Sequence, residues 1–172
     1  MQPLPSHQPP SLASAPSIVT RAALLSDLSA VSDLHARVFG PGRFVRTAYR
    51  VREGTHTVSR FCRVACQGHR MIAAIRMTEI LIAGREGAVM LGPVAVDPAF
   101  ANQGHGRRLI AEAMAAAKAE GLGLVLLVGN ESYYGRLGFV RVTPGQIKFP
   151  GPVDPARILA HELIQGALAS AQ

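Results

Sequence analysis

A loop with two glycines is the first segment whose residue types point to ligand binding. It consists of Asn102, Gln103, Gly104, His105, Gly106 and Arg107. Helical periodicity follows the loop, and a helix that begins here directs unpaired backbone N–H groups and the positive end of its dipole outward. Glycines allow that backbone to approach a phosphate closely. The loop therefore predicts a phosphate site, with an ordinary turn as the alternative.

Two other nucleotide-binding loops do not fit this segment. A dinucleotide fingerprint requires a third glycine at the position that Leu109 occupies. A Walker loop requires Gly-Lys followed by Ser or Thr, and the chain has no such tripeptide. The phosphate prediction therefore rests on the glycines, the helix start and the neighbouring Arg107 and Arg108.

The dipeptide Gly92-Pro93 interrupts an almost wholly apolar run over residues 88–96. Such a run is typical of a central strand buried on both faces. Proline has no N–H for the ladder, so within a sheet it indicates a bulge or a parting of strands. Backbone groups freed in this way can pair with a ligand that contains amides, such as the pantetheine arm of coenzyme A. An edge-strand bulge without a ligand is the alternative.

A pair of tyrosines, Tyr133 and Tyr134, precedes Gly138-Phe139. A phenol at a ligand-lined cleft can donate a proton to a leaving thiolate. The alternative is that both tyrosines serve only in packing.

Composition is that of a single globular domain. The chain has 172 residues, of which 48% are hydrophobic and 17% charged. Residues 1–16 are rich in Pro and Ser and predict a disordered or extended tail. No apolar run is long enough to span a bilayer, and the start does not resemble a secretory signal. We therefore expect a cytoplasmic protein without a membrane partner.

The net charge of +7 fits a polyanionic cofactor or a nucleic acid. The basic residues are dispersed, and no nucleic-acid-binding motif is present, so we expect no nucleic-acid partner. Cys62 and Cys66 fall in one predicted strand, about 13 Å apart, which is too far for a disulfide. Without His or Cys partners at ligand spacing they predict no metal site, and we expect buried, inert thiols.

Periodicity and turn residues predict the elements that position these groups. Strands are expected over residues 17–22, 59–66, 71–82, 88–96, 122–128 and 139–143, and a final apolar segment covers 158–164. Helices are expected from Asp27, capped by Ser26, to Gly40, over 106–120 and over 132–137, with a short helix or structured loop over 43–52. The strand–helix–strand unit over 88–128 should be parallel with a right-handed crossover, which indicates an α/β fold.

These segments, taken in order, resemble the GNAT superfamily of N-acetyltransferases. Residues 91–98, then Gly104-His105-Gly106, then an amphipathic helix, then Tyr134 four residues before Gly138-Phe139, are similar to the family's fourth strand, pyrophosphate loop and catalytic-tyrosine segment. The Leu-Gly-Pro strand and the paired tyrosines resemble a bacterial subgroup of predicted N-acetyltransferases. The resemblance implies an acyl-CoA-dependent N-acetyltransferase domain over 17–172. Its fold would be a central mixed sheet flanked by helices, with a parallel strand pair that splays at the cofactor cleft.

The resemblance also implies roles for single residues. Acetyl-CoA would be the co-substrate, with its pantetheine on the backbone of Val94, Ala95 and Val96 and its pyrophosphate on the loop from Asn102 to Arg107. Tyr134 matches the family's general acid. The remaining cofactor contact implied by position is Asn130. The family loop usually begins with Gln or Arg three residues before the first glycine, where this chain has Ala101, so we expect binding to survive, weaker at most.

The sequence leaves the acceptor and the base open. The acceptor would be an amine of a small molecule or a peptide, bound by loops over 40–58 and 144–156. Glu79, His69 and Glu131 are candidate bases, none of them assigned, and Glu79 is interpreted as an outward-facing strand residue. The spacing of the arginines over 43–50 suggests one helical face, either solvated or beside the acceptor cleft. A non-catalytic acyl-CoA-binding module, transfer of a longer acyl group or transfer to a hydroxyl are the alternatives, and a homodimer remains open.

Overall fold

The computed structural model describes residues 16–41 and 51–171. The strands are β1 (Ile18–Ala22), β2 (Arg63–Gln67), β3 (Arg70–Ile82), β4 (Arg85–Val96), β5 (Leu124–Val128), β6 (Val140–Arg141) and β7 (Ile158–Glu162). The helices are α1 (Leu28–Phe39), α3 (His105–Ala119) and α4 (Glu131–Tyr134), and the 3-10 turns are η1 (Leu25–Asp27), η3 (Pro98–Phe100), η4 (Gly135–Leu137) and η5 (Pro155–Arg157). The predicted tail over residues 1–16 and the arginines over 43–50 lie almost wholly outside the described residues.

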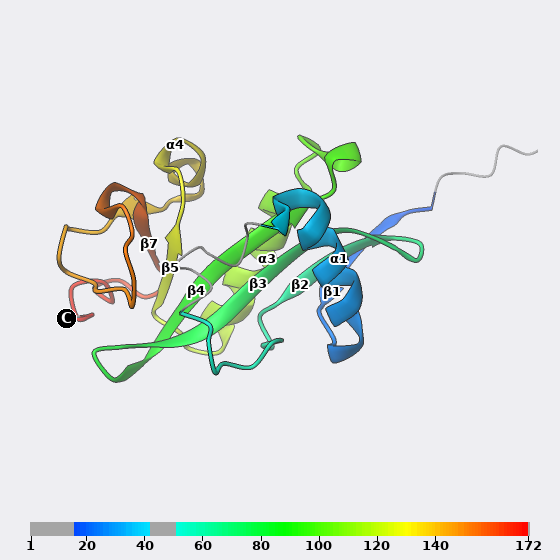
Figure 1. Cartoon of the computed structure of the whole chain (residues 1–172). Coiled ribbons are helices and arrows are strands. Elements are labelled where there is room, and N and C mark those ends of the chain that lie inside the picture. The colour runs from blue at the N-terminus through cyan, green and yellow to red at the C-terminus, as the bar shows by residue number, and fades with distance from the viewer. Residues whose placement is uncertain (1–15, 42–50, 172) are drawn as a thin grey trace, which may run out of the picture.

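The strands form one sheet in the order β1-β2-β3-β4-β5-β7-β6. Only β4 and β5 pair in parallel among the described strands, and the other neighbours are antiparallel. Figure 1 shows this sheet running through the molecule, with α4 and the segment after β4 at its upper end. The mixed α/β sheet with a parallel pair is the fold class that the sequence predicts.

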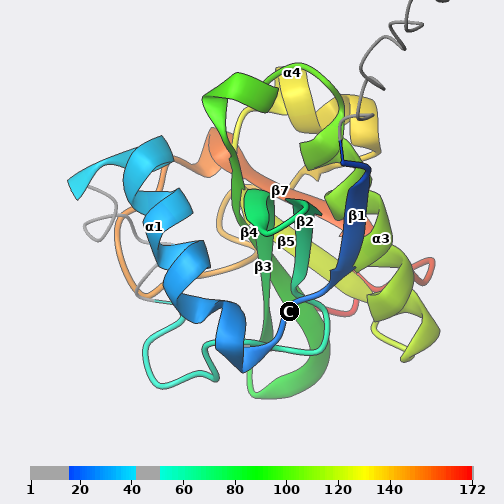
Figure 2. The same cartoon turned by 90° about the vertical axis from the view of Figure 1, so that its right-hand side faces the viewer.

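Helices cover both faces of the sheet, with α1 on one side and α3 on the other (Figure 2). The helix α3 buries Leu109, Ile110 and Ala113 against the sheet, which are the apolar positions at helical spacing. Leu34 of α1 joins a separate core cluster on the opposite face. A third cluster packs the coil over 142–153 onto β5 and β7. The region over 142–153 and α1 therefore share one face of the sheet.

The strands β4 and β5 part midway along their length. Their parallel ladder covers three pairs and ends at Met90 and Leu126, although β4 continues to Val96. On its other side β4 carries a bulge: two steps along β3, from Ile75 to Met77, face three steps along β4, from Leu91 to Val94. The extra residue falls at Gly92-Pro93, so both consequences expected of the proline are present.

Several element boundaries differ from the sequence expectation. Residues 59–62 form a turn that precedes β2, in which the Ser59 hydroxyl donates to the carbonyl of Met77. Cys62 therefore lies before the strand and only Cys66 within it, and both thiols are free. The strand expected over 139–143 shortens to two residues, and β7 lies between β5 and β6.

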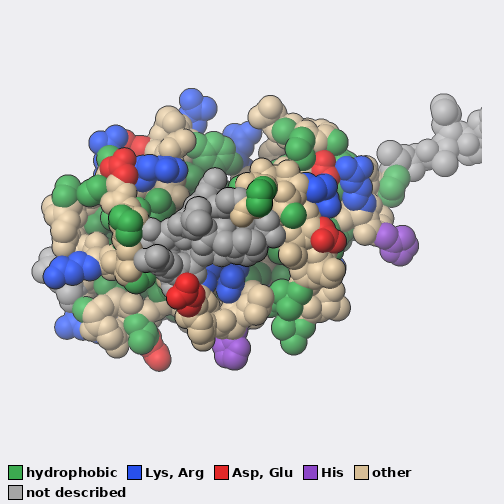
Figure 3. Space-filling model, in the orientation of Figure 1, with side chains coloured by type: hydrophobic (Ala, Val, Ile, Leu, Met, Phe, Trp, Pro, Cys, Tyr) green, Lys and Arg blue, Asp and Glu red, His purple; other side chains and the backbone are tan. Residues whose placement is uncertain are grey.

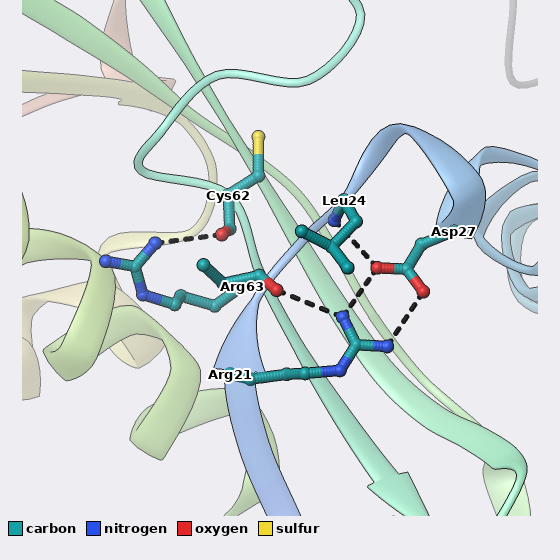
Figure 4. A network of polar contacts seen from close by, with 6 residues as sticks. Arg21, Leu24, Asp27, Cys62 and Arg63 are labelled. Carbon is teal, nitrogen blue, oxygen red and sulfur yellow. Dashed lines mark hydrogen bonds and ion pairs between the residues drawn. The ribbon is translucent and has the colours of Figure 1, made fainter.

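The helix α1 begins at Leu28, one residue later than predicted, because the Asp27 side chain is engaged elsewhere. Its carboxylate accepts hydrogen bonds from both terminal nitrogens of Arg21, at 2.6 and 2.8 Å, and from the N–H of Leu24 at 2.7 Å (Figure 4). Residues 25–27 consequently form a 3-10 turn, and Asp27 rather than Ser26 is the N-cap. Arg21 holds the pKa of Asp27 below its usual range, mainly through these hydrogen bonds.

A buried carboxylate fixes the end of β4. Asp97 accepts from Arg70 at 2.8 Å, caps η3 through the N–H of Ala99 at 3.1 Å, and lies 3.8 Å from Arg37 of α1. The Arg70 hydrogen bond is the largest cause that lowers the pKa of Asp97, followed by the Ala99 N–H. These contacts set the point at which the chain leaves the sheet for the glycine loop.

We expect Asp97→Asn to lower the free energy of unfolding at pH 7. Because the folded-state pKa is lowered, the carboxylate stabilises the fold above its unfolded pKa of about 3.9 and loses this contribution as the pH falls through the folded value. Urea unfolding at pH 7 and pH 3 measures the difference, which should shrink at pH 3.

Asp154→Asn is the matched control, because Asp154 also caps a 3-10 turn that begins with a proline but makes no ion pair with any described residue. A difference between wild type and Asp97→Asn that stays constant between pH 7 and pH 3 would contradict the ion-pair account.

Candidate active site

The N-terminus of α3 presents free backbone donors. Gly104 is the N-cap, with a left-handed φ of 85°, and its carbonyl accepts the first helical bond from the N–H of Arg108 at 3.0 Å. Among the described residues, no group accepts a hydrogen bond from the N–H of His105, Gly106 or Arg107. Three donors at the positive end of a helix of 15 residues suit an anion such as a phosphate.

Side chains of the loop contact one another and leave the N–H groups at the start of α3 free. Gln103 donates to the carbonyl of Ala99 at 3.4 Å, and its amide oxygen lies 3.4 Å from Nε2 of His105. The His105 ring stacks edge-on against Phe100, with centroids 6.2 Å apart. Asn102 takes a positive φ of 61°. The loop is thus held in shape by its own contacts.

The two arginines after the loop differ in their surroundings. Arg108 pairs with Glu112 at 3.0 Å along the same helix. Arg107 is exposed and has no ion-pair partner within the described part of the chain. It lies at a groove of about 270 Å³ along α3, whose other lining residues include Ile110, Met114, Lys118, Leu137 and His161. Arg107 is therefore available to an anion bound at the start of α3.

The side of β4 that faces the parted β5 offers backbone groups of Val94 and Val96. The N–H of Asp97 donates to Ile72 of β3 at 2.8 Å, and in an antiparallel ladder the direction of these groups alternates from residue to residue. The backbone of Ala95 therefore points toward β3, whereas the N–H groups of Val94 and Val96 point away from β3, into the space between the parted strands β4 and β5. This space is the opening.

Gly106 is the point where the loop, β4 and a tyrosine meet. A Cβ at this buried position would lie 3.3 Å from a methyl of Val96, 3.6 Å from one of Val94 and 3.8 Å from the hydroxyl of Tyr133. The absence of a side chain thus lets the start of α3 lie directly on β4. The Tyr133 hydroxyl lies beside this contact between α3 and β4, a placement that the sequence does not predict.

Tyr134 is half-buried against the core. Its ring packs edge-on against Phe139, with centroids 5.9 Å apart, and lies so close to Gly129 that a Cβ there would come within 2.5 Å of it. Burial raises the pKa of Tyr134 to about 12. The phenol is therefore protonated at neutral pH, as a general acid must be. Gly129 therefore leaves room for the Tyr134 ring, a role that nothing in the sequence indicates.

The remaining predicted residues lie at varied distances from this opening. Asn130 is exposed and caps α4 through its carbonyl, which accepts from Tyr133 and Tyr134. Glu131 is exposed and pairs with Arg141 at 2.6 Å. Glu79 is exposed and pairs with Arg60, which also binds Glu120 beyond the far end of α3. His69 is exposed in the β2–β3 turn. The geometry brings neither Glu79 nor His69 to the start of α3.

The opposite face of the sheet carries an apolar cavity of about 360 Å³. It reaches Leu126, the last residue of β5 that pairs with β4, and is also lined by Ile80 and Ile82 of β3. Val51 and residues 146–150 complete it. Both loops that the sequence analysis assigned to the acceptor therefore contribute to one cavity. Figure 3 shows this face of the molecule, on which basic side chains are scattered rather than gathered in one patch.

Arg52 is a further residue that sequence reasoning missed. Its side chain is buried, with 5% of the residue exposed, and it donates to the carbonyl of Gly92 at the bulge of β4. In the sequence, Arg52 before Glu53-Gly54 resembles part of a surface turn, and nothing local indicates a contact 40 residues away.

Comparison with known proteins points to one family. Residues 58–141 match the family model described as an acetyltransferase (GNAT) domain. A search of curated protein sequences found no match. The matched domain and solved structures with the same fold support a GNAT superfamily N-acetyltransferase.

Solved structures share the fold. A GNAT family N-acetyltransferase (YhbS) from Escherichia coli in complex with CoA has a TM-score of 0.75 and 22% identity, over 97% of this chain and 91% of that chain. A GNAT family acetyltransferase from Brucella melitensis in complex with acetyl-CoA has a TM-score of 0.62 and 26% identity, over 84% and 96%. The ribosomal-protein-S18-alanine N-acetyltransferase from Escherichia coli has a TM-score of 0.62 and 19% identity, over 87% and 96%.

No helix over 16–41 or 51–171 is long and apolar enough to cross a membrane. In the same ranges, no group of three or more His, Cys, Asp or Glu side chains could hold a metal ion.

We expect Gly106→Val to fold and to bind acetyl-CoA at least about tenfold more weakly, a loss of ~1.4 kcal/mol. The added side chain meets Val94 and Val96 and fills the place where the backbone must approach the ligand. Isothermal titration calorimetry measures the affinity, and thermal unfolding reports the fold. Ala119→Val, at the exposed far end of α3, controls for a β-branched residue in the helix. Unchanged affinity in a folded Gly106→Val protein would exclude this loop as the anion site.

Proposed function

We propose that this protein transfers an acetyl group, or a related acyl group, from acyl-CoA to a primary amine by direct attack within a ternary complex. The observation that carries the proposal is the opening between β4 and β5 beside the free N-terminus of α3. Pantetheine amides can pair with β4 as a strand would, while the N–H groups of residues 105–107 and the Arg107 guanidinium donate hydrogen bonds to the pyrophosphate. The relatives solved with CoA and acetyl-CoA support the same ligand.

The reaction follows from the groups at the opening. The lone pair of the amine nitrogen attacks the thioester carbonyl carbon, an N–C bond forms, and the C=O electrons move to oxygen. The N–H of Val94 donates to this oxyanion. When the C=O bond re-forms, the C–S bond breaks and its electron pair stays on sulfur, which takes a proton from Tyr134. The nitrogen loses its extra proton to water, and Tyr134 regains one from solvent.

The acceptor is proposed to lie on the face of the sheet opposite α3. The apolar cavity there ends at Leu126, where the strands begin to part, so an amine with an apolar body can rest in it and reach the thioester. Two loops line this cavity, and loops tolerate the sequence variation by which acceptor specificity changes. Peptide N-termini belong among the candidates because one structural relative is named for an alanine acceptor.

A non-catalytic acyl-CoA-binding module is the main competing proposal, because a fold does not fix a function. Ala101, in place of a polar loop residue, is the feature that favours it. The seated and protonated Tyr134 favours an enzyme. A longer acyl donor remains the alternative within the chemistry, since the same cavity could take an acyl tail.

Acetyl-CoA should stabilise the folded protein by mass action, by roughly 2.7 kcal/mol at a hundredfold excess over its dissociation constant. Thermal unfolding with and without acetyl-CoA measures this, and a thiol-release assay against apolar amines, polyamines, amino acids and peptides then finds the acceptor. Stabilisation without thiol release from any acceptor would favour the binding module. An unchanged melting temperature at millimolar acetyl-CoA would argue against both.

Tyr134→Phe should lower kcat on the order of 10²-fold, at the low end for general acid catalysis. The affinity for acetyl-CoA should hold, because the phenol acts on charge that develops late in the reaction. Stopped assays give kcat, and calorimetry gives the affinity. Tyr133→Phe is the internal control and should keep most of the turnover.

The opposite pattern, with Tyr133→Phe inactive and Tyr134→Phe active, would assign the acid role to the hydroxyl beside Gly106. If neither substitution lowers kcat, the sulfur receives its proton from water.

A further inference from the structure

The bulge in β4 leaves the backbone carbonyl of Gly92 without a hydrogen-bond donor from a neighbouring strand. Pro93 has no N–H, and the extra residue between Leu91 and Val94 interrupts the ladder to β3. A buried carbonyl without a donor costs free energy comparable to a lost hydrogen bond. The Gly92 carbonyl finds its donor in Nη2 of Arg52, 40 residues earlier in the chain.

The arginine is itself held in place by the segment that follows it. The Arg52 carbonyl accepts from the N–H of Thr55 at 3.1 Å and from its hydroxyl at 2.7 Å, which closes a turn. The neighbouring Val51 lines the apolar cavity. Arg52 therefore approaches the bulge from the acceptor side.

The contact bears on the oxyanion donor because only Pro93 separates Gly92 from Val94. The direction of the Gly92 carbonyl sets the peptide plane that precedes Pro93, and the fixed φ of proline passes this orientation on to the next peptide. That next peptide carries the N–H of Val94, which points into the opening. A guanidinium hydrogen bond is charge-assisted and stronger than a neutral one, so it holds this geometry firmly.

We propose that Arg52 is a positioning residue for acyl transfer: by holding the Gly92 carbonyl it fixes the bulge and aims the Val94 N–H at the thioester oxygen. The inference rests on the proposed function and extends it to the acceptor side of the sheet. The guanidinium acts through the backbone of β4, so its removal affects the reacting geometry more than it affects the binding of acetyl-CoA, whose pyrophosphate contacts lie at α3.

The test compares Arg52→Met with Arg76→Met, because each arginine donates through Nη2 to a backbone carbonyl on the same face of the sheet. Misplacing the oxyanion donor should lower kcat of Arg52→Met on the order of 10²-fold. The dissociation constant for acetyl-CoA should stay within about threefold, and Arg52→Lys, which keeps a charged donor, should recover at least about tenfold of the loss. Arg76→Met should keep kcat within about threefold.

Hydrogen–deuterium exchange over residues 88–97 provides a readout that does not depend on turnover. Exchange should rise in Arg52→Met and not in Arg76→Met. If wild type transfers no acyl group to any acceptor, the proposed function fails, and exchange alone decides whether Arg52 fixes the bulge. If Arg52→Met does not fold, Arg52→Gln takes its place, since its shorter amide cannot reach Gly92. A folded variant with wild-type kcat, or with unchanged exchange over 88–97, overturns the proposal, as does an equal loss of kcat in Arg76→Met.

Discussion

The parting of β4 from β5 is the constraint on which the rest of the molecule depends. Beyond Met90 and Leu126 the two strands no longer pair, and β5 continues only in its ladder with β7. Val94 and Val96 still pair with β3, but their N–H groups on the β5 side are left without a strand partner in the middle of a sheet. Each unpaired buried donor costs ~1–3 kcal/mol, so an opening of this kind persists only if the surrounding contacts enforce it or a ligand fills it. The feature that lowers the stability of the sheet is therefore the one on which the proposed binding of acyl-CoA depends.

Three contacts from different parts of the chain hold the opening in shape. Asp97 ties the end of β4 to Arg70 and α1, so the strand leaves the sheet at a fixed point. Gly106 allows α3 to rest on β4, which brings free N–H donors to that same point. Arg52 serves the bulge from the other face. The proposed cofactor site and the proposed acceptor site therefore lie on opposite faces of one interrupted strand, as a ternary complex would require.

The parts of this design that the sequence predicted are those with a local signature. Helical spacing predicted α3, and the proline within an apolar run predicted the bulge. The two glycines predicted the loop that leaves N–H groups free at the start of α3. What escaped prediction has no local signature. The place of β7 between β5 and β6 depends on long-range strand pairing. The contact from Arg52 to Gly92 spans 40 residues. Ser26 is not the N-cap of α1, because the hydrogen bonds of Asp27 to Arg21 shift the start of the helix. The spacing to Gly138 selects Tyr134 rather than Tyr133 as the general acid, yet the fold brings the Tyr133 hydroxyl close to Gly106.

Proton transfer from Tyr134 to a thiolate depends on the difference between the pKa values of the two groups. Burial raises the pKa of Tyr134 to about 12. A free thiol has a pKa near 8.5, so full transfer of the proton to a solvated thiolate would run uphill by about 5 kcal/mol. The opening changes this balance, because a thiolate formed between β4 and β5 is also removed from water, and desolvation raises its pKa in the same direction. Under the proposed function, proton transfer from Tyr134 is therefore favourable only while the sulfur remains inside the opening and the C–S bond is breaking. A rigid phenol seated over Gly129 suits that timing better than an exposed one, because it needs no reorientation at the moment the charge appears.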